Sequence, residues 1–311
     1  MSAPSTSGST RRGMGILALG VAIICLQDPI IKAVMAEYAV TEAIVVRSLA
    51  ALPIFAALLW IARDVRGVWR GRPWILVLRG VIFMVSYTCY FLAFPEMPLA
   101  NVVALYFTAP LWVVALSPLV LGERQAPSRW LAVAIGFAGA VVIAQPVGGG
   151  LGWAALLPFA AGAFYAMGQL VARRVGDAAS ATVMSFHQNT VYLIGASALA
   201  LIASPWTAAG GEGALGFLLR TWQWPAPEAL LLMALTGPIA VGGTILLTKA
   251  YREAPPGAVT TIEYTALLWA ALWGYLFFAE VPDLATVVGA VLIVGGGAYA
   301  MTRAAAGRSP A

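Results

Sequence analysis

Aromatic and polar side chains recur inside the long apolar stretches of this 311-residue sequence, at spacings that place them on shared helical faces. Tyr87 and Tyr90 are three residues apart, and Tyr165 and Gln169 are four apart, so each pair projects from one side of a helix. A tyrosine in apolar surroundings needs a partner for its hydroxyl, which favours an inward orientation. These pairs predict a pocket of aromatic faces with hydroxyl and amide edges, suited to a small, partly apolar solute. Ordinary packing between helices is the alternative for each single tyrosine.

A run of three polar residues, His187, Gln188 and Asn189, interrupts another apolar stretch. Three adjacent polar side chains favour a cavity lining over the packing role of a lone buried histidine, and His187 would titrate near physiological pH. Aromatic residues of two further stretches complete the predicted binding set. The set is Tyr87, Tyr90, Tyr106, Trp112, Tyr165, Gln169, His187, Gln188, Tyr264 and Trp269.

Charged residues in apolar stretches are the candidates for coupling or gating, because each costs about 2.5–3.5 kcal/mol to insert into a bilayer. Asp28 and Lys32 are four residues apart, so they share a helical face and can neutralise one another. Pro29 frees a carbonyl and can break or kink that helix. This segment is either a hinge with a polar lining or an ion pair that tethers helices near the membrane surface.

Two more charged residues belong to this group. Arg47 either holds a substrate carboxylate or extends its side chain to the outer surface. Glu263 is the candidate for a proton-coupled carboxylate, and a structural pair with Lys249 is the alternative.

The composition indicates an integral membrane protein. Hydrophobic residues make up 61% of the chain and charged residues 10%, against about 45–50% and about 25% in globular domains. A water-soluble fold could not bury that much apolar surface, so cytosolic enzymes, secreted domains and nucleic-acid binders are excluded. The net charge of +5 is attributed to arginines in cytoplasmic loops.

Few residues suit catalysis or metal binding. The chain has one histidine, and its two cysteines, Cys25 and Cys89, lie in separate apolar stretches, which excludes an H-E-x-x-H or C-x-x-C site. The sequence contains no G-x-x-x-x-G-K-[ST] loop for ATP. We therefore expect no enzymatic activity, no cofactor and no metal.

Ten apolar runs have the length needed to cross a bilayer, about 20 residues each. They must be helical, because lipid offers the backbone no hydrogen-bond partners. The predicted fold is thus all-α, with helices at 14–35, 43–62, 74–94, 99–121, 129–145, 153–172, 182–203, 229–251, 257–279 and 284–302.

The distribution of Lys and Arg predicts the orientation. With a cytoplasmic N-terminus, all of the 18 Lys and Arg residues except Lys32, Arg47 and Arg220 fall at the inner side, which places both termini inside. Residues 1–13 then form a disordered cytoplasmic tail and 303–311 a second tail. The tryptophan-rich loop between the seventh and eighth helices, residues 204–228, is expected to lie on the outer interface.

The chain contains an internal repeat. The segment ending at Glu123 carries T-A-P-L-W, and the segment ending at Glu280 carries T-A-L-L-W at an offset of 157 residues. With one inserted residue, Tyr106 matches Tyr264. The two halves, 14–145 and 153–302, therefore hold five helices each. Because five is odd, they cross the membrane in opposite senses, and the two tyrosines are predicted to bracket one central cavity.

The ten helices, the repeat and the L-G-E that ends at Glu123 resemble the drug/metabolite transporter superfamily, EamA type. The second half departs from this motif, with Phe278-Ala279-Glu280. The resemblance implies export of small metabolites by alternating access without ATP, in a bacterial-type inner membrane. The aromatic-rich character resembles the aromatic amino-acid exporter branch, which implies amino-acid substrates.

Other functions remain open at this point. Nucleotide sugars or drugs are alternative substrates, although a nucleotide-sugar carrier needs more than one central cation. An intramembrane enzyme would need clustered catalytic groups, and a channel would need polar stripes along several helices. Small residues at Gly136, Ala140 and 295–297 permit close helix contact, either within the fold or in a homodimer. The other expected partners are the solute and the lipid bilayer.

Overall fold

The computed structural model describes residues 15, 18–70, 72–122, 125–145, 152–175, 179–203, 213–253 and 263–306, with side chains for all of these except 173–175, 203, 213–215, 245, 247–253 and 301–306. The described residues form helices and no strands. They are α2 (Gln27–Met35), α3 (Val40–Ile61), η1 (Val65–Trp69), α4 (Pro73–Leu92), α5 (Leu99–Tyr106), α6 (Ala109–Leu121), α7 (Pro127–Ala144), η2 (Gly152–Ala155), α8 (Leu156–Val175), α9 (Ala181–Ala203), α10 (Gly213–Leu218), α11 (Pro227–Glu253), α13 (Ala266–Phe278) and α14 (Leu284–Ala306).

Each of the ten predicted ranges contains helix in the described part of the chain. Seven helices there are long and apolar enough to cross a membrane, and the apolar helices Ala266–Phe278 and Leu284–Ala300 are shorter. The all-helical membrane fold is thereby confirmed. A total of ten crossings and the cytoplasmic position of both termini stay predictions.

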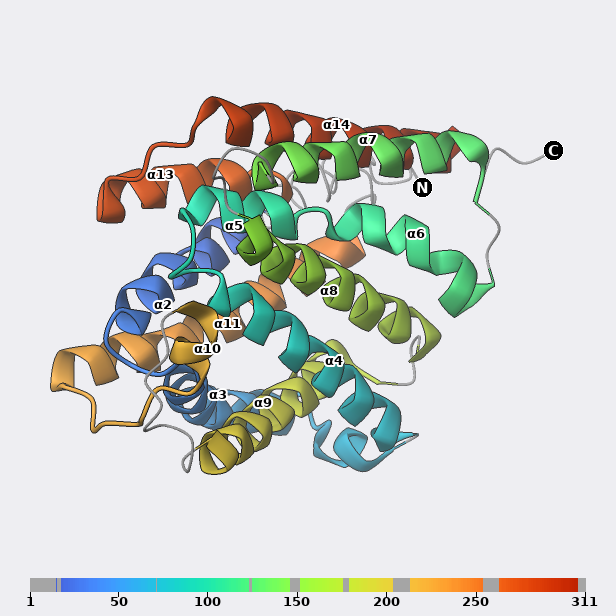
Figure 1. Ribbon diagram of the computed structural model, residues 1–311. Helices are drawn as coiled ribbons and strands as arrows, with labels where there is room; N and C mark the ends of the chain where they lie inside the picture. Colours follow the sequence, from blue (N-terminus) through green and yellow to red (C-terminus); the bar gives the residue numbers. More distant parts are fainter. Residues whose placement is uncertain are drawn as a thin grey trace.

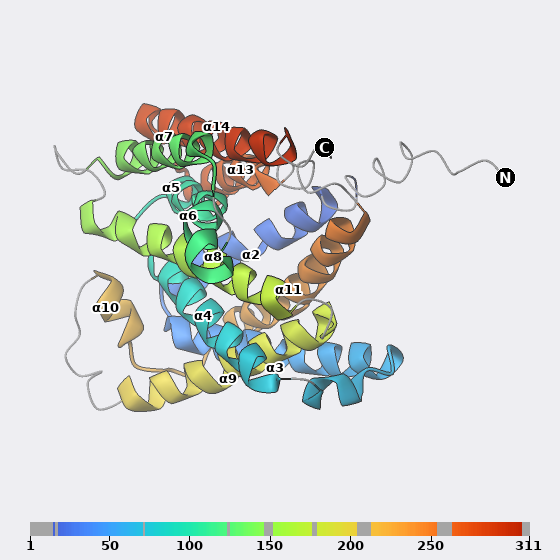
Figure 2. The same cartoon turned by 90° about the vertical axis from the view of Figure 1, so that its right-hand side faces the viewer.

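The two halves of the chain pack on each other through equivalent helices. The second helices, α3 and α9, are in contact, and so are the fifth helices, α7 and α14. The third helix of each half packs on the first helix of the other, as α4 on α8 and α11 on α2. Figures 1 and 2 both show α7 and α14 side by side along one edge. This exchange of partners is the arrangement that two related halves around one axis require.

Glycines allow α7 and α14 to approach closely. A Cβ added to Gly296 would lie 2.7 Å from the carbonyl oxygen of Ala132 and 3.0 Å from the nitrogen of Gly136. A Cβ at Gly139 would lie 2.6 Å from the carbonyl oxygen of Gly289. At these positions the small residues therefore serve packing within the fold. This is the first of the two roles that the sequence left open for them, the other being a homodimer contact.

A hydrogen-bonded cap fixes the start of α14 against the end of α7. Asp283 Oδ1 accepts from the backbone N–H of Thr286 at 2.8 Å, and Asp283 Oδ2 accepts from Gln145 Nε2 at 2.8 Å. Gln145 itself terminates α7 in the left-handed conformation, with φ 43°. The bonds from Thr286 and Gln145 favour the charged carboxylate and hold the pKa of Asp283 below its usual value.

The first helix is interrupted where the sequence predicts a kink. Leu26 forms a turn between two helical segments, and its backbone N–H donates to the carbonyl of Ile23, three residues earlier. Pro29 has no N–H to donate to the carbonyl of Cys25, so the helical bonding pattern fails at this turn. The predicted effect of Pro29 is confirmed.

The segment 219–226 of the predicted outer loop is fastened to the turn between α2 and α3. Arg220 Nη1 donates to the carbonyls of Met35 and Ala36 at 2.9 and 3.1 Å, and Trp222 Nε1 donates to Thr41 Oγ1 at 2.8 Å. The arginine thus satisfies carbonyls left free at the C-terminus of α2. Residues 204–212 of that loop lie outside the described residues.

The fourth helix is divided, although an uninterrupted helix over 99–121 was expected. Phe107 and Thr108 separate α5 from α6, and Pro110 in the first turn of α6 cannot donate to the carbonyl of Tyr106. Helix α8 passes close to this break, because a Cβ at Gly162 would lie 2.9 Å from the Tyr106 carbonyl oxygen.

The same architecture recurs in the second half at the repeat offset. Thr265 is the N-cap of α13 as Thr108 is of α6, and both have right-handed φ and ψ. At the other end, Gly122 and Ala279 both adopt the left-handed conformation, with φ 72° and 54°. The departure from L-G-E in the second half therefore changes the residue and leaves the backbone shape intact.

We expect Ala279→Gly to stabilise the protein by about 1 kcal/mol, because a Cβ in the left-handed region costs about 1–2 kcal/mol and glycine removes that cost. The reciprocal change, Gly122→Ala, should destabilise the protein by a similar amount. No atom crowds that position, so the left-handed backbone conformation is the only source of the cost. Thermal unfolding in detergent measures both. A loss of stability in the Ala279→Gly variant would contradict this account.

We expect Gly296→Ala to destabilise the protein by about 1–3 kcal/mol, because its methyl group would push α7 and α14 apart. Gly295→Ala is the matched control, since a Cβ at Gly295 meets nothing within 4 Å and alanine favours helix. Unfolding midpoints of the two variants should move in opposite directions; equal shifts would show that close packing at Gly296 is unimportant.

Candidate substrate-binding site

Six aromatic side chains from four helices, here called the aromatic cluster, form the centre of a larger group of rings in contact that also includes Phe91, Phe94, Phe107 and Tyr264. Tyr90 lies 4.8 Å from Tyr106 between ring centroids, and Tyr106 lies 5.4 Å from Tyr165, so three predicted residues meet. Tyr87 joins the cluster through Tyr90, at 6.5 Å. The members are Phe83, Tyr87 and Tyr90 of α4, Tyr106 of α5, Tyr165 of α8 and Tyr192 of α9.

A pocket lies beside the cluster, between helices of the two halves. It is too narrow to admit a water molecule in this conformation, and its lining comes from α3, α4 and α9. Tyr87 and Tyr192 form part of the wall, with ring centroids 5.6 Å apart. The lining residues are Ile44, Arg47, Met84, Tyr87, Phe91 and Tyr192.

Arg47 is the charged group of this pocket. Its guanidinium carbon lies 5.8 Å from the ring centre of Tyr87 and 5.9 Å from that of Tyr192. The residue is 8% exposed, so its side chain does not extend to the outer surface, which was one of two expectations. Its Nε and Nη1 are buried and have no hydrogen-bond partner among the described residues. Such unsatisfied donors cost about 1–3 kcal/mol.

Asp28 and Lys32 do not pair with each other, so that expectation is wrong. Asp28 Oδ2 accepts from the hydroxyl of Tyr90 at 2.9 Å, which brings α2 to the aromatic cluster. Lys32 lies one turn further along and reaches Glu280 of the second half, 2.5 Å between Nζ and Oε1. The reason is geometric. The Glu280 carboxylate and the Met97 carbonyl lie beside the Lys32 ammonium, while the Tyr90 hydroxyl donates to Asp28.

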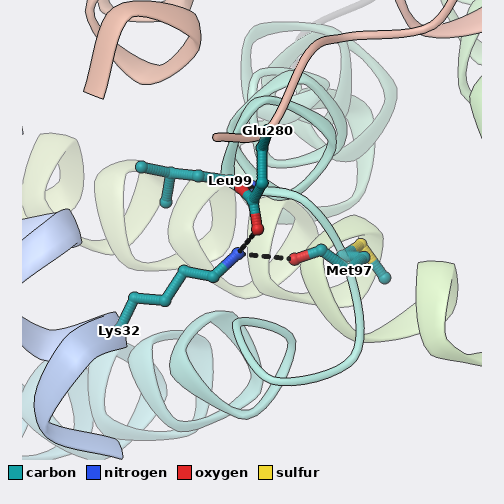
Figure 3. A network of polar contacts seen from close by, with 4 residues as sticks. All are labelled: Lys32, Met97, Leu99 and Glu280. Carbon is teal, nitrogen blue, oxygen red and sulfur yellow. Dashed lines mark hydrogen bonds and ion pairs between the residues drawn. The ribbon is translucent and has the colours of Figure 1, made fainter. Parts of the chain in front are cut away.

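Figure 3 shows the network around Glu280. Lys32 Nζ also donates to the carbonyl oxygen of Met97 at 3.1 Å, and Glu280 Oε2 accepts from the backbone N–H of Leu99 at 2.8 Å. Glu280 thereby caps the free N-terminus of α5 as well as neutralising Lys32. One carboxylate of the second half fixes α2 and α5 of the first.

The polar run of α9 divides into three roles. Gln188 donates from Nε2 to the hydroxyl of Tyr192 at 3.0 Å and accepts from Arg79 Nη1 at 3.2 Å, so it joins the cluster. Asn189 donates to the carbonyl of Ser48 and ties α9 to α3. His187 Nδ1 contacts the carbonyl oxygen of Val183 in its own helix, 2.9 Å away, and is not part of the pocket lining.

The remaining predicted residues lie at different distances from the cluster. The side chain of Gln169 lies beside the hydroxyl of Tyr165, as their spacing predicts. Trp112 packs on Phe137 and Phe159, and Trp269 stacks on Trp273. These two tryptophans therefore form separate aromatic contacts and do not join the cluster.

Tyr264 meets the break in the fourth helix. Its ring lies 5.6 Å from that of Phe107, so the interrupted helices of the two halves touch. Because Thr108 and Thr265 are equivalent helix starts, Phe107 is the equivalent of Tyr264, and the expected match of Tyr106 with Tyr264 through one inserted residue is wrong. Its hydroxyl fills the space that a Cβ on Gly297 would need. Glu263, the preceding residue, interacts electrostatically with the hydroxyls of Tyr165 and Tyr264. The side chain of Lys249 lies outside the described residues.

Sequence reasoning missed three cluster neighbours. Arg79, counted at the inner end of the predicted helix 74–94, is the seventh residue of α4 and lies 4.4 Å from the ring centre of Phe83. Arg79, Phe83 and Tyr87 follow at spacings of four, so extending the Tyr87 stripe backwards would have found the first two. Tyr192 is likewise four residues after Gln188, which gives the same signal.

Comparison with known proteins agrees with this architecture. A model of the EamA-like transporter family matches the chain twice, over residues 11–145 and 152–302. The chain belongs to the EamA-like transporter family. The double match confirms the two-fold repeat, and the protein is a membrane transporter of small metabolites.

The relatives of this transporter carry different substrates in their names. A riboflavin transporter of Rhizobium johnstonii is 30% identical over 74% of this chain and 70% of its own. A pseudopaline exporter of Pseudomonas aeruginosa is 31% identical over 72% and 73%. An S-adenosylmethionine uptake transporter of Rickettsia prowazekii is 25% identical over 72% and 70%. These names do not include the aromatic amino-acid exporters that the sequence resembled.

A solved structure shares the fold. It is titled only as the crystal structure of a protein, aligns with a TM-score of 0.64 at 18% identity, and covers 96% of this chain and 99% of its own.

We expect Glu280→Gln to destabilise the protein by about 1–3 kcal/mol, since the amide leaves Lys32 without its counter-charge and cannot accept on both sides. Glu37→Gln, at an exposed position five residues after Lys32, is the control and should have no effect. Unfolding midpoints in detergent test this. In a Lys32→Met background the effect of Glu280→Gln should shrink; an unchanged effect would show that the two residues are not coupled.

Proposed function

We propose that this transporter exports small metabolites by alternating access, with the aromatic cluster and its pocket as the substrate site. The observation that carries the proposal is the origin of the pocket walls. Arg47 and Tyr87 come from the first half and Tyr192 from the second. A relative movement of two halves that share one site opens that site first to one side of the membrane and then to the other.

Amino acids, including aromatic ones, are the proposed substrates. Tyrosine faces suit a flat or apolar solute body, and hydroxyl and amide edges suit its polar head. Riboflavin and S-adenosylmethionine, named for two relatives, also combine a ring system with polar groups and belong in the first test panel. Nucleotide sugars and drugs are the alternative. The proposed location is a bacterial-type inner membrane.

Counterflow in proteoliposomes tests transport directly. Vesicles loaded with one unlabelled amino acid should accumulate the same amino acid in labelled form, because exchange requires a carrier cycle and a channel gives none. Repeating the assay from acidic to alkaline pH with the wild-type protein and with Glu263→Gln tests whether Glu263 couples transport to protons, because the variant should then lose the pH dependence. The absence of saturable exchange for every amino acid in the panel would refute the substrate assignment.

We expect Tyr106→Ala and Tyr264→Ala each to reduce transport about 3- to 10-fold, since an aromatic contact is worth about 0.5–1.5 kcal/mol beyond its buried area. Tyr275→Ala is the control, because Tyr275 is 61% exposed on α13. Initial rates of counterflow, normalised to folded protein, are the measurement. Wild-type rates in both test variants would remove these tyrosines from the site.

A further inference from the structure

We propose that Arg47 binds a carboxylate of the transported solute, so that this transporter selects monocarboxylates with an aromatic or flat apolar body. The inference rests on the proposed function for its physiological meaning, and it assigns the polar end of the substrate to one residue.

The first argument is the unsatisfied state of the Arg47 side chain. Nε and Nη1 are buried without hydrogen-bond partners among the described residues, and the whole residue is only 8% exposed. A guanidinium stays protonated in proteins. A buried cation with free donors at the wall of a pocket is therefore a binding site for an anion.

The second argument is the charge around Arg47. Asp28 is near enough to interact with it electrostatically, but the Asp28 Oδ2 atom is engaged by the hydroxyl of Tyr90. Asp28 thus moderates the positive potential without filling the Arg47 donors. Arg47, Arg79 and Asp28 all interact electrostatically with Tyr87, and their formal charges sum to +1, which one added carboxylate balances better than a doubly charged phosphate does.

The third argument is the shape of the surroundings. Arg47 lies against the faces of Tyr87 and Tyr192, and Met84 and Phe91 complete an apolar wall. A solute that places its carboxylate on the guanidinium would lay its body along these side chains. The planar guanidinium matches the two oxygens of a carboxylate better than it matches a single hydroxyl.

Arg79 offers a contrast within the same cluster. It also lies over an aromatic ring, that of Phe83, and its Nε is likewise buried without a partner among the described residues, but its Nη1 donates to Gln188. Arg47 has two such donors and lines the pocket, whereas Arg79 has one and does not line it. Arg47 is therefore the assigned site.

Phenylacetate and phenylacetamide form the decisive pair of probes, because they differ only in carboxylate against neutral amide. The thermal unfolding midpoint of the purified full-length protein in detergent should rise with millimolar phenylacetate. Phenylacetamide should need at least a tenfold higher concentration to give the same rise. Binding to the folded state alone produces such a shift. Equal shifts from the two probes, or no shift from phenylacetate, would overturn the proposal.

Variants then locate the site. Arg47→Gln should abolish the difference between the two probes, Arg47→Lys should retain part of it, and the exposed control Arg66→Gln should leave it unchanged. A carboxylate-specific shift that persists in Arg47→Gln would place the anion elsewhere. If Arg47→Gln does not fold, the wild-type comparison of the two probes and Arg47→Lys still decide the question.

Counterflow with L-phenylalanine and L-phenylalaninamide separates this proposal from the proposed function. Exchange of the acid at least tenfold faster than the amide supports both. Exchange of both at equal rates supports a transporter and overturns the carboxylate site. Failure of both to exchange, with a phenylacetate shift that depends on Arg47, refutes the amino-acid assignment and supports the site.

Discussion

The packing of one half of the chain against the other is the constraint on which the rest of the structure depends. Helices α3 and α9, and helices α7 and α14, bring equivalent parts of the repeat into contact. The pocket depends on the first of these pairs, because Arg47 lies on α3 and Tyr192 on α9. Backbone groups cannot be left unpaired in lipid, so each half keeps its own helical hydrogen bonds. Under the proposed alternating access, a relative movement of the halves would reshape a site at their boundary.

Much of the fold could be predicted from the sequence, because spans in lipid are governed by length and hydrophobicity. The repeat was also visible, since T-A-P-L-W and T-A-L-L-W share an offset that places Thr108 and Thr265 at equivalent helix starts. The breaks before these threonines were not predicted. In the first half Pro110 gave a signal for the break, but in the second half Leu267 stands at the equivalent position, so no local residue type marks the interruption there.

The site was predictable where partners lie on one helix and unpredictable where they come from several. Gln169 with Tyr165 followed from spacing alone, and the same rule applied to Arg79 and Tyr192 would have found them. Lys32 shows the limit of that rule. Its local partner Asp28 is satisfied by Tyr90, and its true partner Glu280 is 248 residues away in the sequence. The partner of a charged side chain depends on the tertiary arrangement, and spacing within one helix carries no information about that arrangement.

The two bonds of Glu280, to Lys32 and to the backbone N–H of Leu99, bear on the rate of transport. The carboxylate joins an ammonium on α2 to the first backbone N–H of α5, and it does so with atoms that are only partly open to water. Under the proposed alternating access, separating Glu280 from these helices would break an ion pair and a hydrogen bond before water could replace them. The loss of these polar contacts would then contribute to the activation barrier for opening at that end.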